Sequence, residues 1–80
     1  MLTDYIRIAM QKATYELLED GTFYGVIPEC QGVWGNASTL KNCREDLLVA
    51  LEGWIILGLR VGHTLPILDG IDLNLSSEVA

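Results

Sequence analysis

Few side chains in this 80-residue sequence have the type and spacing that catalysis or metal binding requires. His63 is the only histidine, and neither cysteine lies near it at metal-ligand spacing. Cys30 follows Glu29, whose negative charge opposes formation of a reactive thiolate. Cys43 falls on the apolar stripe of a predicted helix, where we expect a small core residue. We therefore predict that the protein is not an enzyme and that it holds neither a cofactor nor a metal ion.

Carboxylates at Glu45, Asp46 and Glu52 are the remaining candidates for chemistry. General acid–base catalysis needs a carboxylate in a cleft from which water is excluded, and the neighbouring sequence builds no such cleft. The spacing of Glu45 and Glu52 places both on one face of a helix, while Asp46 points elsewhere. We interpret this face as exposed to solvent, with a binding surface for a basic partner as the alternative.

These carboxylates lie on residues 38–62, the longest segment with helical periodicity. A hydroxyl of Ser38 or Thr39 can cap the start of this helix, and Gly62 suits its end. The main apolar stripe of the helix comprises Leu40, Cys43, Leu47, Ala50, Leu51, Trp54, Leu57 and Val61.

The second half of this helix is apolar almost all round over residues 54–59, so it must be buried on more than one side. We predict a subunit interface there, formed by Trp54, Ile55 and Leu59. The alternative is that an N-terminal helix or the last strand covers these side chains. Half of all residues are hydrophobic, which is a large share for so small a monomer, and we expect a homo-oligomer, a dimer or a tetramer.

Short segments of helix and strand precede and follow the long helix. The pattern predicts an N-terminal helix at residues 4–12 and strands at residues 14–19, 22–27, 33–36 and 71–75. The element order is therefore α-β-β-β-α-β. We predict an α+β fold in which a four-stranded, mostly antiparallel sheet of order 3-2-1-4 packs on the one long helix. A single domain spans residues 1–80, with an N-terminal helix at 1–13, a core at 14–75 and a frayed tail at 76–80.

The turn between the first two strands sets their register. Asp20-Gly21 predicts a two-residue turn of type I′, because both central residues of that turn have positive φ. Such a turn pairs Leu18 with Phe23 and Leu17 with Tyr24. Both faces of the hairpin then carry apolar side chains, so we expect the N-terminal helix or a partner to cover the second face.

Charge and hydropathy limit the classes of partner. The net charge of −6 repels phosphate backbones, so we expect no direct binding of nucleic acid and favour a basic protein partner. No apolar run approaches the length of a bilayer span, and the first residues lack the pattern of a signal peptide. We therefore expect a cytoplasmic protein that does not bind a membrane.

An ordered set of segments from residue 13 to residue 75 resembles the HicB-like antitoxin family, most closely its short members with an additional N-terminal helix. The segments that carry this resemblance are Tyr15-Glu16-Leu17, Asp20-Gly21, Phe23-Tyr24-Gly25-Val26-Ile27-Pro28, Ser38-Thr39-Leu40 and Leu65-Pro66, together with the apolar spacing of the long helix. Two features depart from the family. The loop Pro28-Glu29-Cys30-Gln31-Gly32 replaces a typical Pro-Asp-Leu-Pro-Gly, and we expect the protein to lack the C-terminal DNA-binding domain of the longer members.

The resemblance implies a core likened to a reduced ribonuclease-H fold that lacks the catalytic carboxylates. It also implies that the protein binds and neutralises HicA, a small basic toxin that cleaves RNA, and that it forms dimers or tetramers. The alternative is a stand-alone oligomeric regulatory or ligand-binding domain of the same fold without a toxin partner. For contact with a toxin we predict Tyr24, Trp34, Glu29, Glu45 and Glu52.

Overall fold

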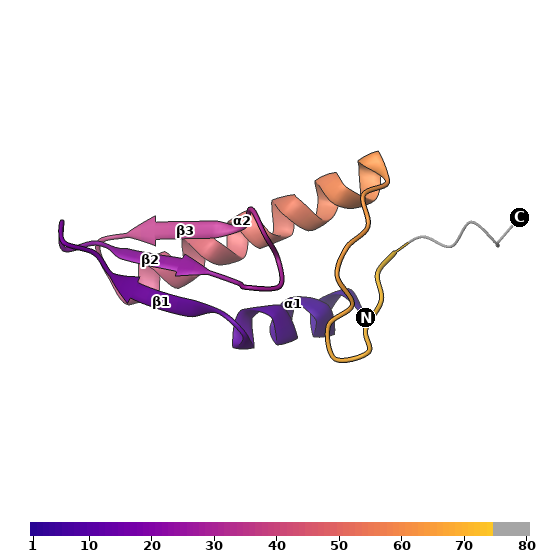
Figure 1. Cartoon of the computed structure of the whole chain (residues 1–80), viewed down its shortest axis with the longest axis horizontal. Coiled ribbons are helices and arrows are strands. Elements are labelled where there is room, and N and C mark those ends of the chain that lie inside the picture. The colour runs from indigo at the N-terminus through magenta and orange to yellow at the C-terminus, as the bar shows by residue number, and fades with distance from the viewer. Residues whose placement is uncertain (75–80) are drawn as a thin grey trace, which may run out of the picture.

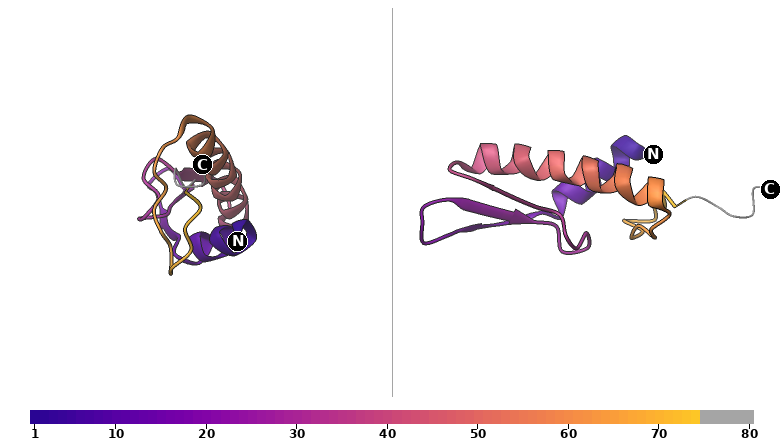
Figure 2. Two further views of the ribbon diagram at one scale, coloured as in Figure 1. Left: turned by 90° about the vertical axis from the view of Figure 1, so that its right-hand side faces the viewer. Right: turned by 90° about the horizontal axis from the view of Figure 1, so that it is seen from above.

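The computed structural model describes residues 1–74, which form two helices and a three-stranded sheet. The elements in chain order are α1 (Leu2–Gln11), β1 (Thr14–Leu17), β2 (Phe23–Val26), β3 (Trp34–Ala37) and α2 (Leu40–Val61) (Figure 1). The sheet is antiparallel throughout, in the order β1-β2-β3. The first half of α2 packs on one face of this sheet, chiefly on β3 and β2, and its second half projects beyond the strands, above α1 in the view of Figure 1 (Figures 1 and 2).

The ends of α2 follow the chemistry of their capping residues. The Thr39 side chain accepts a hydrogen bond from the Asn42 N–H at 3.1 Å, which satisfies one of the unpaired donors of the first turn. Gly62 ends the helix in the left-handed conformation, with φ of 77°. The predicted ends of the long helix are confirmed. Its buried face comprises Cys43, Leu47, Leu51, Ile55 and Gly58.

The core has its centre where α1 meets the second half of α2. Helix α1 buries Tyr5, Ala9 and Met10 in this cluster. The connection between β2 and β3 and the segment after α2 complete it, through Ile27, Cys30, Val33, Leu65 and Leu68. Helix α1 therefore packs beside α2 and leaves the opposite face of the sheet uncovered (Figure 2).

The turn between β1 and β2 differs from the prediction by one residue. Leu17 pairs with Phe23, and the Leu18 N–H donates to the Thr22 carbonyl, so three residues rather than two connect the strands. Asp20 accounts for this turn, because its Oδ1 accepts from the Thr22 N–H at 2.9 Å and from the Thr22 hydroxyl at 2.6 Å. Gly21 then supplies a positive φ of 84°. The predicted pairing of Leu18 with Phe23 was wrong.

Because successive side chains of a strand point to opposite sides, this shift of one residue in register changes which side chains of β1 share a face with which side chains of β2. The face toward α2 carries Tyr15, Leu17, Phe23, Gly25, Gly35 and Ala37. The opposite face carries Thr14, Glu16, Tyr24, Val26, Trp34 and Asn36. This second face mixes polar and apolar side chains, so the sheet has one buried face and one that tolerates solvent.

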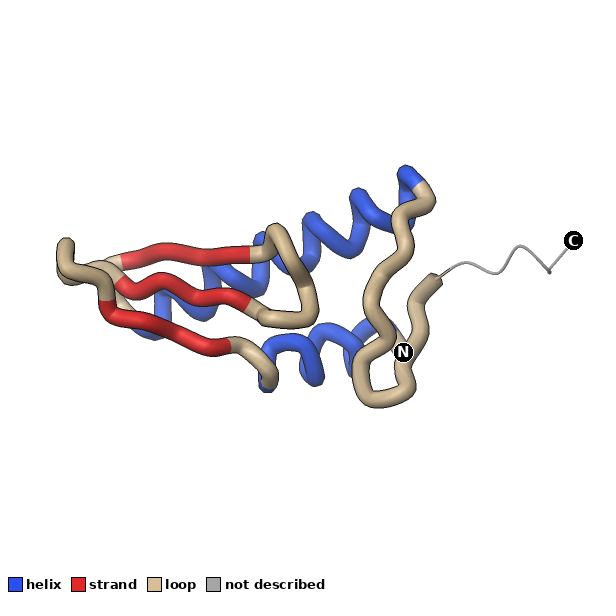
Figure 3. Tube along the Cα trace, in the orientation of Figure 1, coloured by secondary structure: helices blue, strands red, loops and turns tan. Residues whose placement is uncertain are grey.

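The predicted fourth strand, and with it the four-stranded sheet of order 3-2-1-4, was wrong. Among residues 71–74 only an isolated bridge between Leu68 and Ile71 forms, and Leu75 and the predicted tail lie outside the described residues. The reason is local. Asp69 and Gly70, both with positive φ, make a tight turn, and the Asn74 side chain bonds both backbone groups of Leu65, at 2.6 and 2.9 Å. Side-chain hydrogen bonds thus hold this segment beside Leu65 as a loop, away from the edge of β1 (Figure 3).

The edge of β3 carries a further side-chain contact. Asp46 of α2 accepts a hydrogen bond through Oδ2 from the Asn36 N–H at 3.0 Å. The Asn36 side chain in turn donates to the Phe23 carbonyl at 2.8 Å. The last strand is therefore tied both to the helix above it and to the start of β2.

Two glycines allow α2 to approach the sheet closely. A Cβ on Gly35 would lie 2.7 Å from the Leu47 backbone nitrogen and 2.9 Å from the Cys43 carbonyl oxygen. A Cβ on Gly25 would lie 3.3 Å from the Cys43 Sγ of α2 and 2.9 Å from the Tyr15 ring of β1. The obstruction at Gly35 is helix backbone, which cannot turn aside as a flexible side chain can.

We therefore expect Gly35→Ala to destabilise the protein by about 1–3 kcal/mol, the usual cost of overpacking. Gly53→Ala is the matched control, because Gly53 lies within α2 and its added Cβ would meet nothing within 4 Å. At a protein concentration that keeps the chain monomeric, this control should gain about 0.5–1 kcal/mol from helix propensity. Urea unfolding followed by circular dichroism measures both, and an equal effect of the two substitutions would contradict the close contact.

A tyrosine hydroxyl links α1 to the segment that follows α2. The Tyr5 hydroxyl donates to the Pro66 carbonyl oxygen at 2.7 Å, and the Tyr5 side chain is fully buried. Burial, helped by the negative charges of Cys30 and Asp72, raises the pKa of Tyr5 from 10.0 to about 12. The stability linked to this raised pKa is complete below about pH 10 and is lost as the pH rises through about 12.

Tyr5→Phe should cost about 1 kcal/mol at neutral pH, because it removes this hydrogen bond and retains the ring. It should also reduce the loss of stability between pH 10 and pH 12. Guanidinium unfolding at pH 7.5, 10 and 11.5 compares the variant with the parent. A variant that loses as much stability in alkali as the parent would show that Tyr5 is not the titrating group.

Candidate protein-interaction site

The face of the sheet opposite α2 is the candidate site, and we call it the open sheet face (Figure 2). It consists of Thr14, Glu16, Tyr24, Val26, Trp34 and Asn36. Trp34 is 55 % exposed, which is high for the largest apolar side chain, while Tyr24 and Val26 are half-buried. Glu16 stands directly opposite Tyr24 in the register of β1 and β2. Sequence reasoning missed Glu16, because the predicted two-residue turn paired the strands one residue out of step.

Tyr24 on the central strand β2 and Trp34 at the start of the edge strand β3 are the two aromatic side chains of the open sheet face. Trp34 pairs with Val26, and Tyr24 pairs with Asn36, so the two aromatic rings are diagonal neighbours on adjacent strands. Their centroids lie 6.2 Å apart with the planes inclined by 33°, within the range in which aromatic rings attract one another. The hydrogen-bonded strands fix both backbones, so this aromatic surface exists before any partner arrives.

A shallow cavity of about 270 Å³ adjoins the two rings. Its walls come from Tyr24, Val26 and Trp34 and from residues of the connection between β2 and β3. Short backbone hydrogen bonds hold this connection, from the Cys30 N–H to the Ile27 carbonyl at 2.9 Å and from the Val33 N–H to the Cys30 carbonyl at 3.2 Å. The cavity can receive a projecting side chain of a partner, and it is too small to enclose a large ligand.

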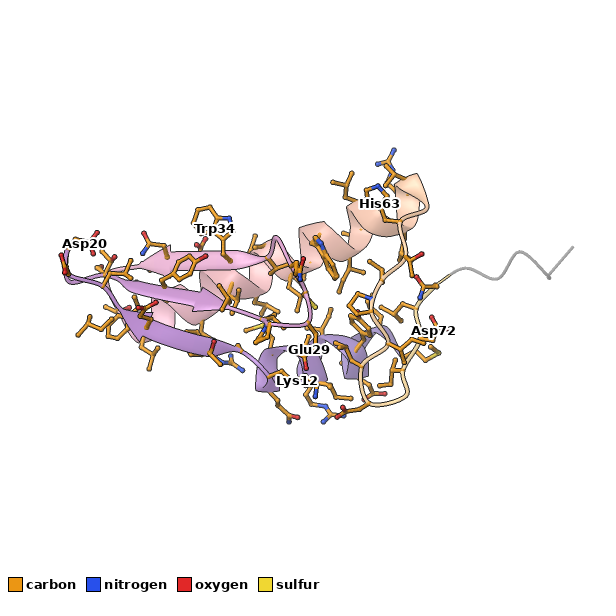
Figure 4. All side chains as sticks on the ribbon, in the orientation of Figure 1. Lys12, Asp20, Glu29, Trp34, His63 and Asp72 are labelled. Atoms are coloured by element: carbon orange, nitrogen blue, oxygen red, sulfur yellow. The ribbon has the colours of Figure 1, made fainter. Side chains whose placement is uncertain are left out.

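Glu29 lies on the same connection but away from Trp34, on the side toward α1 (Figure 4). Its Oε2 is 3.9 Å from the Lys12 Nζ, and Lys12 makes a closer ion pair with Asp69 at 3.1 Å. The hydrogen bond to Asp69 is the main cause that raises the pKa of Lys12. Glu29 thus belongs to a small charge cluster at the edge of the aromatic surface.

Glu45 and Glu52 lie on α2, in the other layer of the molecule from Tyr24 and Trp34. Both glutamates are exposed. The structure brings Tyr24 and Trp34 together, places Glu29 beside Lys12 on the side toward α1, and separates the two helix glutamates from the aromatic pair. One flat partner surface therefore does not reach all five residues predicted for contact with a toxin.

The residues predicted for self-association occupy different environments. Ile55 is 2 % exposed and lies in the core, whereas Trp54 and Leu59 are partly buried against that core. The apolar side chains that α2 presents to solvent are instead Val49, Ile56, Leu57 and Val61. The exposed pair Val49 and Ile56 is seven residues apart, a helical spacing that the sequence contains and that the prediction from the main apolar stripe overlooked.

Both cysteines are fully buried and unpaired. Burial, with a contribution from the charge of Glu29, raises the pKa of the Cys30 thiol from 9.0 to about 11. Burial also raises the pKa of Cys43, whose Sγ lies 3.6 Å from the Gly35 carbonyl oxygen. Both thiols are protonated at neutral pH and inaccessible, which makes them unsuitable as nucleophiles.

His63 follows α2 in an exposed position. Within residues 1–74, no group of three or more histidine, cysteine, aspartate or glutamate side chains could hold a metal ion. Neither of the two helices described here has the length and apolar character needed to cross a membrane.

The chain matches one family model and is similar to a solved structure. A family model described as UPF0150-like matches residues 4–66, which include both helices almost completely and all three strands. The crystal structure of TTHA0281 from Thermus thermophilus is similar, with a TM-score of 0.86 and 41 % sequence identity over 94 % of this chain and 94 % of that chain. No curated protein matches the chain.

The buried thiols give a direct test of the fold around the candidate site. At pH 8 the pKa of about 11 should leave the Cys30 thiolate roughly 100-fold less populated than in the unfolded chain. We expect Cys30 to react with an aromatic disulfide reagent at least that much more slowly in native protein than in urea, and the buried Cys43 also to react more slowly. Ser38→Cys, at an exposed position, is the control and should react at once. Fast reaction of the native parent would contradict the burial of Cys30 and Cys43.

Proposed function

Since this chain belongs to the UPF0150-like family, whose small proteins are related to HicB-like antitoxins, we propose that it is an antitoxin without enzymatic activity. In this proposal it binds a small basic toxin of the HicA type and prevents that toxin from cleaving RNA. The family supports the general class of function. The open sheet face supports the mode of binding.

The observation that carries the proposal is the exposed aromatic pair on a rigid strand surface. Tryptophan and tyrosine supply most of the free energy at many protein interfaces, because they bury a large area at a small cost in conformational entropy. Trp34 is 55 % exposed in this chain and lies beside Tyr24 and a cavity. A large exposed aromatic residue on an ordered strand surface has no role in the core, which favours a role in recognition.

Charge favours a basic partner at this face. Glu16 lies opposite Tyr24, and the chain as a whole carries a net charge of −6. Complementary charges of this kind mainly increase the rate of association and exclude partners of the same sign. Glu29 can exchange its distant contact with Lys12 for a cation of the toxin, because Lys12 keeps its closer partner Asp69.

Neutralisation by this surface requires no chemistry from the antitoxin. A protein bound over the active surface of a ribonuclease excludes the RNA, and its own negative charge repels the phosphates of the substrate. This mechanism suits a protein whose thiols are buried and protonated and whose described residues assemble no metal site.

A second candidate function is a stand-alone oligomeric regulatory or ligand-binding domain without a toxin. The apolar side chains that α2 exposes, among them Val49 and Ile56, favour it. The neighbouring reading frame in the genome distinguishes the two candidates. A small basic protein encoded beside this chain favours the antitoxin, and the absence of one favours the stand-alone domain.

The proposal predicts that Tyr24→Ala and Trp34→Ala each weaken binding of a small basic toxin of the HicA type by roughly 30-fold or more, the effect expected at an interface hot spot. Isothermal titration with a catalytically inactive toxin measures affinity, and protection of RNA from the active toxin measures inhibition. The double variant Glu45→Gln/Glu52→Gln, which changes only α2, should keep both properties.

The reverse pattern would contradict this placement of the interface. If the glutamate variant lost inhibition while the aromatic variants kept it, the toxin surface would lie on α2. If the parent chain neither bound nor inhibited the toxin, the antitoxin proposal itself would fail. Circular dichroism of each variant verifies that the fold is intact.

A further inference from the structure

We infer that the solvent-facing side of α2 is the docking surface for a second copy of this chain, with the two α2 helices antiparallel about a two-fold axis. The surface is a single stripe of Glu45, Val49, Gly53, Ile56 and Arg60, which we call the outer stripe. Steps of three and four residues place all five on one side of the helix, opposite the face that packs in the core.

The outer stripe is open and apolar at its centre. Val49 is 66 % exposed and Ile56 is 58 % exposed, although both are β-branched residues typical of protein interiors. Gly53 lies between them, and a Cβ built on it would meet nothing within 4 Å. The middle of the stripe therefore has no side chain, which lets another helix approach closely.

The two ends of the outer stripe carry opposite charges. Glu45 is near the start of α2, and Arg60 is near its end. Along a straight helix they are about 22 Å apart, at 1.5 Å for each residue, so they cannot pair with each other in one copy. Among the ion pairs of residues 1–74, neither Glu45 nor Arg60 takes part.

An antiparallel pair of α2 helices accounts for both the exposed apolar centre of the outer stripe and the opposite charges at its two ends. An axis that crosses between residues 52 and 53 sets Arg60 of each copy against Glu45 of the other, and Ile56 of each against Val49 of the other. Every contact then occurs twice, as a two-fold interface requires. A parallel pair would instead set Glu45 against Glu45 and Arg60 against Arg60. The stripe is thus complementary to itself in one orientation, which favours a second copy over an unrelated protein.

The neighbouring groove extends this surface. Leu2 and Ile6 of α1 line a small apolar cavity of about 90 Å³ together with Glu52, Ile55 and Ile56 of α2. Leu2 is 49 % exposed at its rim. Self-association thus uses side chains on the free side of α2, whereas Ile55 already packs in the core. The open sheet face stays uncovered in both copies, so this dimer is independent of the toxin proposal.

Charge reversal tests this interface in solution. Sedimentation velocity over a concentration series should show a dimer for the parent chain. Arg60→Glu and Glu45→Arg should each weaken dimerisation by about tenfold or more, because each places two pairs of like charges across the axis. The double variant Glu45→Arg/Arg60→Glu restores opposite charges and should recover the dimer.

Three further variants sharpen the test. Ile56→Gln should weaken the dimer, since it removes apolar area from the centre of the stripe. Glu52 lies beside the axis, where it approaches its own copy, so Glu52→Gln should strengthen the dimer. Arg44→Glu changes charge on exposed α2 surface outside the stripe and should have no effect. Recovery by the double variant separates a broken interface from a misfolded chain.

A monomeric parent at all concentrations would overturn the inference. So would a dimer that both single charge reversals leave unchanged, because it must then use another surface. A double variant that stays monomeric while its circular dichroism is native would also overturn it, since the charges would then not face each other across the axis.

Discussion

The close contact between the first half of α2 and the centre of the sheet is the constraint on which the rest of this structure depends. It requires glycine at residue 35, because backbone atoms of Cys43 and Leu47 occupy the space in which a side chain would lie. The Cys43 thiol fills the remaining gap beside the Gly35 carbonyl. Once α2 is held there, its length carries the second half beyond the strands, where α1 and residues 65–68 pack against it. The molecule thus has a sheet end and a helical end, and each has its own exposed surface.

The two candidate surfaces follow from this division. At the sheet end, α2 covers one face only, so Tyr24 and Trp34 remain outside on ordered backbone. At the helical end, α1 covers one side of α2 only, so Val49 and Ile56 remain outside. Because the surfaces lie in different layers, contact with a partner at one does not obstruct the other.

Much of the fold could be predicted from local chemistry, and the errors have local causes. The hydroxyl of Thr39 and the flexibility of Gly62 fixed the ends of α2, and both were predicted. The hairpin register failed because the Asp20 carboxylate bonds Thr22 and adds a residue to the turn. Alternating polarity at residues 71–75 predicted a strand, yet Asn74 bonds the backbone of Leu65 instead. Neither of these side-chain contacts has a periodic signal in the sequence.

The candidate site was predicted in part for the same reasons. Tyr24 and Trp34 were identified by residue type and by their place on short strands, and the structure brings them together. Whether Glu45 and Glu52 share a surface with Tyr24 and Trp34 could not be predicted from the sequence, because it depends on which face of the sheet α2 covers. Glu16 was overlooked because a shift of one residue in register moves it from one face to the other.

The contact of Asp46 with the Asn36 N–H has a consequence for the way this sheet can meet other chains. A free strand edge normally offers unpaired main-chain donors to any extended peptide. Repeated addition of strands at such an edge leads to aggregation and fibrils. On β3 one of those donors is already occupied by a carboxylate, whose charge also repels acidic peptides. Extension of the sheet along this edge is therefore discouraged, and a partner must be selected by the shape and charge of side chains on the face, where sequence, and not merely backbone, determines the fit.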